Sequence, residues 1–502
     1  MTASADDERM RFDVIRASAT QGTAARLGRL ALPQRKAIDT PDFVAVTSRG
    51  AVPHITPDNL SRHVNAAGAY IALEDFIERS QVNPGRVPPI YKMPPAPQSK
   101  PLHAFTVMPP STITVLGARR FPAVASPLGN SQGSISVFTS TGFQNLTTAA
   151  YEAAVEALKP DVAIPLADLP NASVTPKSKR AQRMVERTDE WLAQWLRHLD
   201  PATLLRPSSV SVFAPLLPVS YPVQWDYLNR LSEDYLEHLS GLAIYGTEIL
   251  PHLKDYENLL LLPRLSLDEP RSPHDILRQI SLGVDLFLVP FINNASDSGV
   301  ALTFAFPPPA TTSTDATATF TTRLPLGVDM SAEEHQTSLA PLREGCTCYA
   351  CTRHHRAYVR HLLHAREMLG WTLLQLHNHR VLADFFSGVR ASLSSSSSSS
   401  EFETERARFA EVYDDVLPTG SGERPRARGY HFKSEAGEKR RNKPAWAKFA
   451  ADEPVVLGSV GESDTGSANG CVREPAETPV APEESAAEWD RKSFAEMNGN
   501  VR

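Results

Sequence analysis

The sequence predicts an α/β fold, a (β/α)8 TIM-type barrel, on the strength of two observations. Up to about residue 386, short apolar runs rich in β-branched residues alternate with helical patterns roughly eight times. No G-x-G-x-x-G turn follows any of these runs, which disfavours the rival fold, an open doubly wound sheet. A chain of 502 residues, 41% of them hydrophobic, is long enough for one such domain with further segments attached.

The expected strands are the short apolar runs themselves. They lie at residues 43–47, 112–116, 135–138, 161–165, 210–215, 242–245, 259–263, 284–290 and 300–306. Apolar residues three or four apart, from Trp225 to Leu239, predict a helix with one buried face. A second helix is predicted from an N-capping Ser272, with Pro273 at its first position and Gly283 at its end.

Composition divides the chain into a folded part and a tail. Residues 1–386 are predicted to form the barrel, interrupted by proline-rich insertions at 83–111 and 307–322. The serine tract at 394–400 marks a flexible linker, assigned to residues 387–400. Residues 401–414 are compatible with a short helix, and 415–502 are expected to be mostly disordered.

Charge and cysteine content restrict the class of protein. The net charge of -6 means that any contact with nucleic acid requires a local basic patch. The N-terminus lacks an apolar stretch, and no run of about 18 apolar residues occurs, so neither a signal peptide nor a membrane span is expected. The chain has only four cysteines, and we interpret it as a soluble protein of a reducing compartment.

Three of the four cysteines form a tight cluster, Cys346-Thr-Cys348-Tyr-Ala-Cys351, whereas Cys471 lies in the tail. Cysteines this close are hard to bridge to one another, which argues against disulfides. Structural zinc takes four thiolate or imidazole ligands in a tetrahedron. The sequence therefore predicts one structural zinc ion per chain, held by these three cysteines and a histidine in an inserted subdomain at about residues 340–380. The alternative is three free cysteines in a loop.

The fourth ligand comes from a histidine-rich stretch, and His377, one long helix beyond Cys351, is the preferred candidate. Other histidines lie near enough in sequence that spacing alone leaves the choice open, and they are His354, His355, His361, His364 and His379.

The complete pattern C-x-C-x2-C-x25-H, from Cys346 to His377, resembles the zinc signature of the tRNA-guanine transglycosylases. Shorter matches follow in the family's order, at residues 25–30 (ARLGRL), 40–43 (TPDF), 50–52 (GAV), 140–144 (STGFQ), 177–191, 240–246 (SGLAIYG) and 283–287 (GVDLF). The family is a (β/α)8 barrel that exchanges guanine for a deazaguanine base at the wobble position of tRNA. The resemblance implies that fold here, and supports His377 as the fourth ligand.

The two carboxylates of the family's reaction are missing from this chain. The family's nucleophile is an aspartate that follows G-V-D-x-F and attacks the ribose, but that position holds Leu288, which has no lone pair. A second aspartate, which precedes the S-G-G-F-Q loop and acts as acid/base, corresponds to Thr139, whose hydroxyl is too weak an acid for that role.

The residues with which the family grips RNA and reads the base are also replaced. Two arginines after the nucleophile correspond to Asn294 and Asp297. The base-reading aspartate corresponds to Ala167, with Asp161 and Asp168 flanking it. Asp297 is a poor substitute nucleophile because the sequence shows nothing that would orient it, and Asp285 is expected to cap or pack rather than to catalyse.

This combination of lost chemistry and retained scaffold resembles the non-catalytic eukaryotic branch of the family, as does the segment 299–306. The branch implies a chain without catalytic residues, paired in a heterodimer with a catalytic queuine tRNA-ribosyltransferase subunit and meeting tRNA through that complex. It also implies a cytoplasmic location, with peripheral association with the mitochondrial outer membrane. Two alternatives stay open, an active transglycosylase with a relocated carboxylate and a stand-alone zinc and RNA-binding module.

Three surfaces have open roles at this point. The basic helix at 177–187 either contacts phosphates or is a solvated helix face. The basic cluster at 424–448 either contacts RNA or an anionic membrane, or is a basic tail without a partner. The helices around the zinc are predicted to meet the catalytic subunit, because the zinc region supports the dimer interface in the family that the chain resembles.

Overall fold

A computed structural model of the chain describes residues 10–17, 23–64, 66–77, 87–94, 99–126, 129–139, 142–170, 176–198, 210–309, 323–394 and 400–425. Several predictions lie outside these residues. They concern the tail at 426–502, Cys471 within it, the centre of the serine tract at 395–399 and much of the two proline-rich insertions.

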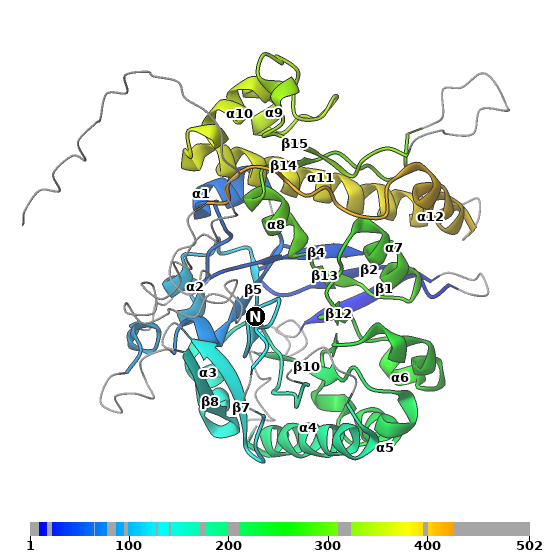
Figure 1. The fold of residues 1–502 in the computed structure, drawn as a ribbon. Helices are drawn as coiled ribbons and strands as arrows, with labels where there is room; N and C mark the ends of the chain where they lie inside the picture. Colours follow the sequence, from blue (N-terminus) through cyan, green and yellow to red (C-terminus); the bar gives the residue numbers. More distant parts are fainter. Residues whose placement is uncertain are drawn as a thin grey trace, which may run out of the picture. The chain divides into compact units, whose positions relative to one another are not determined.

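Eight parallel strands close into a barrel, which confirms the predicted fold class (Figure 1). In order around the barrel they are β4 (Asp42–Val46), β5 (Gly68–Ala72), β6 (Ile113–Gly117), β9 (Val162–Ala163), β10 (Ser211–Leu216), β11 (Gly241–Ile244), β12 (Arg264–Ser266) and β13 (Leu286–Leu288), which pairs with β4 again. The order around the barrel follows the sequence, as expected when each strand is followed by a crossover helix.

Helices follow the strands along the chain. These elements are α1 (Pro57–Asn59) with the π-helix η2 (Leu60–Val64), α2 (Pro101–Thr106), α3 (Thr148–Leu158), α4 (Ser178–His198), α5 (Tyr221–Glu233), the 3-10 helix η6 (Thr247–Asp255) with α6 (Glu257–Leu260), α7 (Pro273–Ser281) and α8 (Phe291–Asp297). None of the helices in the described part of the chain has both the length and the hydrophobicity to cross a bilayer.

Three small sheets are not hydrogen-bonded to the barrel strands. Strands β1 (Arg11–Ala17), β2 (Arg26–Ala31) and β3 (Ile38–Thr40) pair in an antiparallel sheet before the first barrel strand. The hairpin β7 (Ser134–Thr139) and β8 (Gly142–Thr147) is inserted between β6 and α3. Strands β14 (Val300–Leu302) and β15 (Gly327–Asp329) pair after the barrel has closed. The runs at 135–138 and 300–306 therefore contribute strands, but not barrel strands.

Two strand predictions are wrong. The predicted strands omit β5, whose sequence GAYIA is poor in β-branched residues although all five positions are buried. The run at 259–263 is not the strand that its apolar residues predict, because α6 ends at Leu260 and β12 begins only at Arg264. Burial inside the barrel, and not local propensity, decides the structure of β5. At 259–263 the apolar residues end a helix on the outside of the barrel, where Leu261 is 66% exposed.

The two predicted helices differ in how well they match. Helix α7 begins at Pro273 with Ser272 as its N-cap, and Gly283 follows in a left-handed conformation with φ of +91°. In α5, Leu228 and Leu231 are buried as predicted, but the Trp225 side chain is 52% exposed. The backbone at Gln224 is not helical, so the predicted apolar face does not extend back to Trp225.

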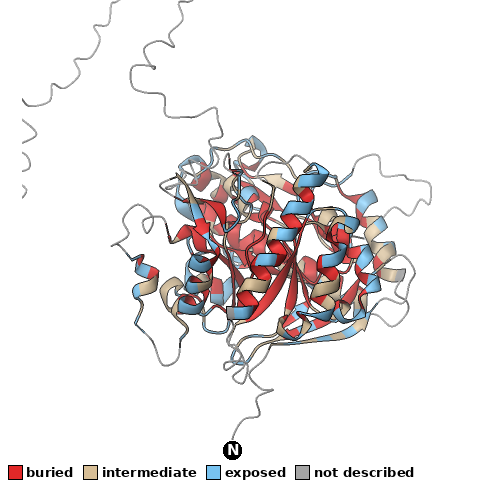
Figure 2. Cartoon of the chain, turned by 90° about the horizontal axis from the view of Figure 1, so that it is seen from below, coloured by how far each residue is buried: buried red, intermediate tan, exposed pale blue. Residues whose placement is uncertain are grey.

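The barrel interior is an apolar core. Figure 2 shows buried residues along the central strands and exposed residues on the outer sides of the helices. Val44, Val115, Phe213, Leu265 and Leu288 belong to one cluster of buried side chains contributed by different strands. The interior is thus filled by side chains, as is usual for this fold.

The last long helix, α11 (Met368–Ser394), carries the chain past the predicted linker boundary at residue 387. Val389 and Ser392 are buried, so packing against the barrel keeps this stretch helical. Helix α12 (Ser400–Val412) follows and buries Phe402 and Phe409. The ring of Phe409 lies 4.9 Å from that of His274 on α7. Helix α12 is therefore packed onto the folded part of the chain.

Replacing Phe409 with alanine should lower the free energy of unfolding by about 3–5 kcal/mol, because a fully buried aromatic ring leaves a cavity. Chemical denaturation measures the change. The control is Glu411→Ala on the exposed side of the same helix, for which a change within about 0.5 kcal/mol is expected. Equal effects of the two substitutions would show that α12 does not contribute to the core.

Candidate metal centre

The three cysteines are gathered by the start of one short helix. Cys348 is the N-cap of α9 (Tyr349–Arg353), and its Sγ accepts a hydrogen bond from the Cys351 N–H at 3.3 Å. Cys346 comes directly after Gly345, which turns the chain with φ of +72°. The close contacts among the thiols lower the pKa of Cys346 and raise the pKa of Cys348, because without a metal ion the neighbouring sulfur atoms share a proton.

His377 completes the group from the middle of α11. Its side chain is fully buried, and Nε2 lies 2.9 Å from the Leu302 carbonyl of β14. A carbonyl only accepts, so Nε2 carries the proton and Nδ1 presents its lone pair. Nδ1 lies 3.7 Å from Sγ of Cys346, 3.6 Å from that of Cys348 and 3.4 Å from that of Cys351.

These distances fit one metal ion. A tetrahedron with Zn–S bonds of about 2.3 Å and a Zn–N bond of about 2.0 Å has S···N edges of about 3.5 Å. All four donor atoms lie within 4.8 Å of one another. Leu342, Ala350, Leu374 and other buried apolar residues pack around the group. Such a closed donor set leaves no position for a substrate, as in structural sites.

Three of the neighbouring histidines are engaged elsewhere. His379 Nδ1 donates to the Gln375 carbonyl at 2.9 Å, and its ring faces Phe43. Burial lowers the pKa of His379 to about 4, which keeps this imidazole neutral. His355 caps α10 (Arg356–His364), and His354 stacks on Tyr358. The structure thus brings His377, of the histidines that spacing left open, to the cysteines.

In the barrel, the residue at the position of the family's nucleophile is apolar, and so are the side chains around it. Leu288 is the last residue of β13 and is fully buried in the core of the barrel. Thr139 ends β7, and its hydroxyl donates to the Gly142 carbonyl at 2.9 Å. Asn294 and Asp297 both lie on α8. Asp297 has a partner that the sequence did not reveal, because its Oδ1 lies 2.6 Å from Nε2 of His54.

The two aspartates that flank Ala167 lie at opposite ends of β9. Asp161 precedes the strand and accepts from Lys100 at 2.8 Å and from Arg35 at 3.0 Å. Asp168 follows the strand, on the side where the active sites of such barrels lie. Neither carboxylate is free to read a base, since Asp168 is engaged as well.

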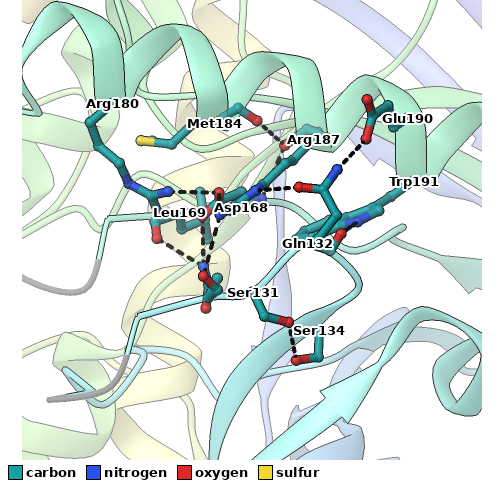
Figure 3. Close-up of polar contacts among 12 residues, drawn as sticks. Ser131, Gln132, Ser134, Asp168, Leu169, Arg180, Met184, Arg187, Glu190 and Trp191 are labelled. Atoms are coloured by element: carbon teal, nitrogen blue, oxygen red, sulfur yellow. Dashed lines mark hydrogen bonds and ion pairs between the residues drawn. The ribbon is translucent and has the colours of Figure 1, made fainter.

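Figure 3 shows how Asp168 is engaged. Arg180 and Arg187 project from α4 toward it and donate to its carboxylate, Arg180 at 2.6 and 3.0 Å and Arg187 at 3.0 Å. Asn130 adds a fourth hydrogen bond at 2.8 Å. Two cations of the basic helix predicted at 177–187 therefore have an internal partner, whereas Lys179 and Arg183 are exposed. On the other side of the barrel, Asp285 packs as expected in a buried pair with Arg26.

Sequence reasoning missed the partners of these residues. The hydrogen-bond acceptor of His377 is a backbone carbonyl, which leaves no signal in a sequence. The pairing of Asp168 with Arg180 and Arg187 joins a loop to a helix whose register was not predicted. The His54–Asp297 pair spans most of the barrel sequence. The sequence offers one signal for the pairing of Asp168, namely that a basic helix follows the strand beside which this aspartate lies.

Comparison with known proteins places these features in a family. The sequence profile described as "Queuine tRNA-ribosyltransferase" matches residues 21–413. A Schizosaccharomyces pombe protein named "Queuine tRNA-ribosyltransferase accessory subunit 2" is 36% identical over 418 residues, which cover 82% of this chain and 87% of that protein. Proteins of the same name from Drosophila grimshawi and Ixodes scapularis are 32% and 28% identical, covering 57% and 76% of this chain and 68% and 96% of their own lengths.

Replacing His377 with alanine should abolish metal binding, because the three thiolates lose their fourth corner and the group loses its anchor to β14. Metal content of the purified chain, measured by mass spectrometry, checks this. The matched control is His379→Ala, two residues further along the same helix, which should keep about one ion per chain. Loss of the metal from a folded His379→Ala chain, or its retention in His377→Ala, would contradict the assignment.

Proposed function

The chain belongs to the queuine tRNA-ribosyltransferase family, and from this premise we propose that it is the non-catalytic accessory subunit of a heterodimer with a catalytic subunit of that family. The complex would exchange guanine for queuine at the wobble position of tRNAs with GUN anticodons. The relatives' printed names support the accessory role. The observation that carries the proposal is Leu288, a fully buried leucine where the reaction requires a nucleophilic aspartate.

Three carboxylates that follow barrel strands on the C-terminal side support this interpretation, because each has a partner within the chain. Glu74, after β5, accepts from the Arg120 side chain at 2.7 Å. Asp268, after β12, accepts from the Thr247 hydroxyl at 2.7 Å. Asp168 is held by two arginines. Catalysis requires groups that bind the transition state more strongly than the ground state, and groups already engaged within the chain are poorly suited to that.

We assign the metal as one structural zinc ion, with Cys346, Cys348, Cys351 and His377 as ligands. The donor set, the S···N distances and the apolar surroundings support it. When bound, the zinc would tie α9 to α11 and β14. This is a folding role and involves no substrate.

The partner surface is proposed on the helices around the zinc. Tyr349, Met368 and Leu369 are large apolar side chains there, 42%, 52% and 43% exposed. Exposed apolar groups on one face of a protein are typical of association surfaces. We propose a cytoplasmic location, with peripheral association at the mitochondrial outer membrane, from the family resemblance.

One observation favours the second candidate, an active transglycosylase with a relocated carboxylate. Asp297 is held by His54 and is partly exposed, with 26% of its side chain accessible. Such a pair can position a carboxylate, but α8 carries it beyond the end of β13. The third candidate, a stand-alone zinc and RNA-binding module, is set apart by whether the chain needs a catalytic partner.

Incorporation of labelled queuine into tRNA separates these candidates. The chain alone should give no exchange, and its addition to a catalytic homologue should raise the rate above that of the homologue alone. Exchange by the chain alone would sink the accessory role, and loss of that exchange in Asp297→Asn would place the chemistry on α8. No increase with the homologue, together with a stable unpartnered chain that binds RNA, would favour the third candidate.

The partner surface predicts that Met368→Asp weakens association with the catalytic homologue by about tenfold or more, because a charge replaces an apolar side chain in the buried interface. Titration calorimetry measures the affinity. Trp225→Asp is the control, since Trp225 is also 52% exposed but lies on α5, apart from the metal-binding helices in Figure 1. A similar loss in both variants would remove the metal-binding helices as the interface.

A further inference from the structure

The first half of α4 has a high positive charge. Residues 177–187 contain five basic side chains and only one acidic side chain, that of Glu186. The chain as a whole has a net charge of -6, so this excess of positive charge is local. Attraction for a polyanion is therefore expected at this helix and not over the surface in general.

The barrel holds this part of α4 in a fixed position. Met184 and Val185 are buried in the largest cluster of core side chains. Arg180 and Arg187 donate to the carboxylate of Asp168, which is fully buried just after β9 (Figure 3). Because Asp168 follows its strand, these bonds lie on the C-terminal side of the barrel, where barrels of this type bind their substrates.

The other three cations of the stretch are directed to solvent. Lys177, Lys179 and Arg183 are exposed, and their side chains have no hydrogen-bond or ion-pair partner within the described part of the chain. Lys179 and Arg183 are four residues apart, so they project from one side of α4, about 6 Å apart along its axis. These charges are compensated by counterions, which a polyanion can release on binding.

We propose that Lys177, Lys179 and Arg183 bind the sugar-phosphate backbone of RNA. The choice of RNA rests on the proposed function, in which tRNA is the substrate of the complex. Residues 177–187 include no aromatic side chain that could stack on a base. The contact is therefore made with phosphates, which position an RNA without reading its sequence.

An anionic membrane fits α4 less well than RNA does. A helix that lies on a bilayer inserts an apolar face between the lipids. The apolar side chains of α4 face the barrel instead, and Ala181, Met184 and Leu192 are all buried. Only the charged side of the helix is accessible, which suits a phosphate backbone.

The test compares the full chain with a variant that carries Lys177→Gln, Lys179→Gln and Arg183→Gln. Fluorescence anisotropy measures the affinity for a labelled tRNA transcript over a salt series. The variant should raise Kd about tenfold or more at low salt and reduce the slope of log K against log salt by up to about three. A transcript of unrelated sequence should show the same loss, and a loss confined to one sequence would contradict binding through phosphates.

The opposite end of the barrel supplies a control of equal charge. Lys159, Arg197 and Arg278 are exposed cations at the C-terminal ends of α3, α4 and α7. Replacing these three with glutamine should leave Kd and the salt slope unchanged. Equal effects of the two triple variants would mean that net charge, and not this surface, governs RNA affinity.

A substitution of opposite sign tests the same surface without removing a cation. Glu186 is exposed and accepts a hydrogen bond from Gln182 at 2.9 Å. Glu186→Gln removes the one negative charge of the stretch and should therefore lower Kd for the transcript. The proposal is overturned if neither this variant nor the triple variant changes Kd. It is also overturned if the three cations govern binding to anionic phospholipid vesicles but not to RNA.

The outcome is separable from that of the proposed function. RNA affinity is measured on the chain without a partner, whereas the accessory role is read from exchange in the complex. If the chain fails to stimulate exchange but the triple variant still binds RNA more weakly, α4 binds RNA and the accessory role is wrong. If the chain stimulates exchange and the substitutions change no affinity, the accessory role stands and the RNA-binding proposal falls.

Discussion

The hydrogen bond from His377 to the Leu302 carbonyl is the contact on which the attachment of the metal-binding part depends. It fixes the imidazole tautomer, so that the other ring nitrogen faces three sulphur atoms. The next residue, Asn378, donates to the Val300 carbonyl at 3.0 Å and accepts from the Leu302 N–H at 2.8 Å. Helix α11 is thus joined to β14 at two successive residues. Metal binding worth about 10–16 kcal/mol would then hold the cysteine loop to the same helix.

The difference in stability between a buried leucine and a buried carboxylate at position 288 accounts for a chain that keeps the barrel but lacks the nucleophile. A leucine buried at position 288 contributes about 1.5–3 kcal/mol to the core, whereas an unpaired carboxylate buried there would cost stability. An enzyme tolerates that cost because the charge reacts. Under the proposed accessory role the position can hold an apolar side chain, while the barrel and the proposed metal ligands are still needed for folding.

Features of this structure that leave a repeating or local sequence pattern could be predicted from the sequence. Contacts between residues far apart in the chain could not. Alternating strands and helices gave the barrel, and the cysteine spacing gave the metal loop, because both depend on local patterns. Strand β5 was missed because its glycine and alanine content hides a fully buried strand. The linker boundary at 387 ignored Val389, whose burial extends α11. The partners of Asp168 and Asp297 depend on tertiary geometry, which spacing does not contain.

The polar groups on the C-terminal side of the barrel agree with the proposal that a second, catalytic subunit supplies the chemistry. Asp168 is buried and paired with Arg180 and Arg187, and removing one partner of such a buried pair typically costs about 3–5 kcal/mol. A reaction that recruited this carboxylate would have to break those bonds as the transition state formed, which would raise the barrier. The same bonds stabilise the end of the barrel and the position of α4. The carboxylate therefore serves the fold of this chain, and under the proposed accessory role the groups that stabilise a transition state come from the catalytic subunit.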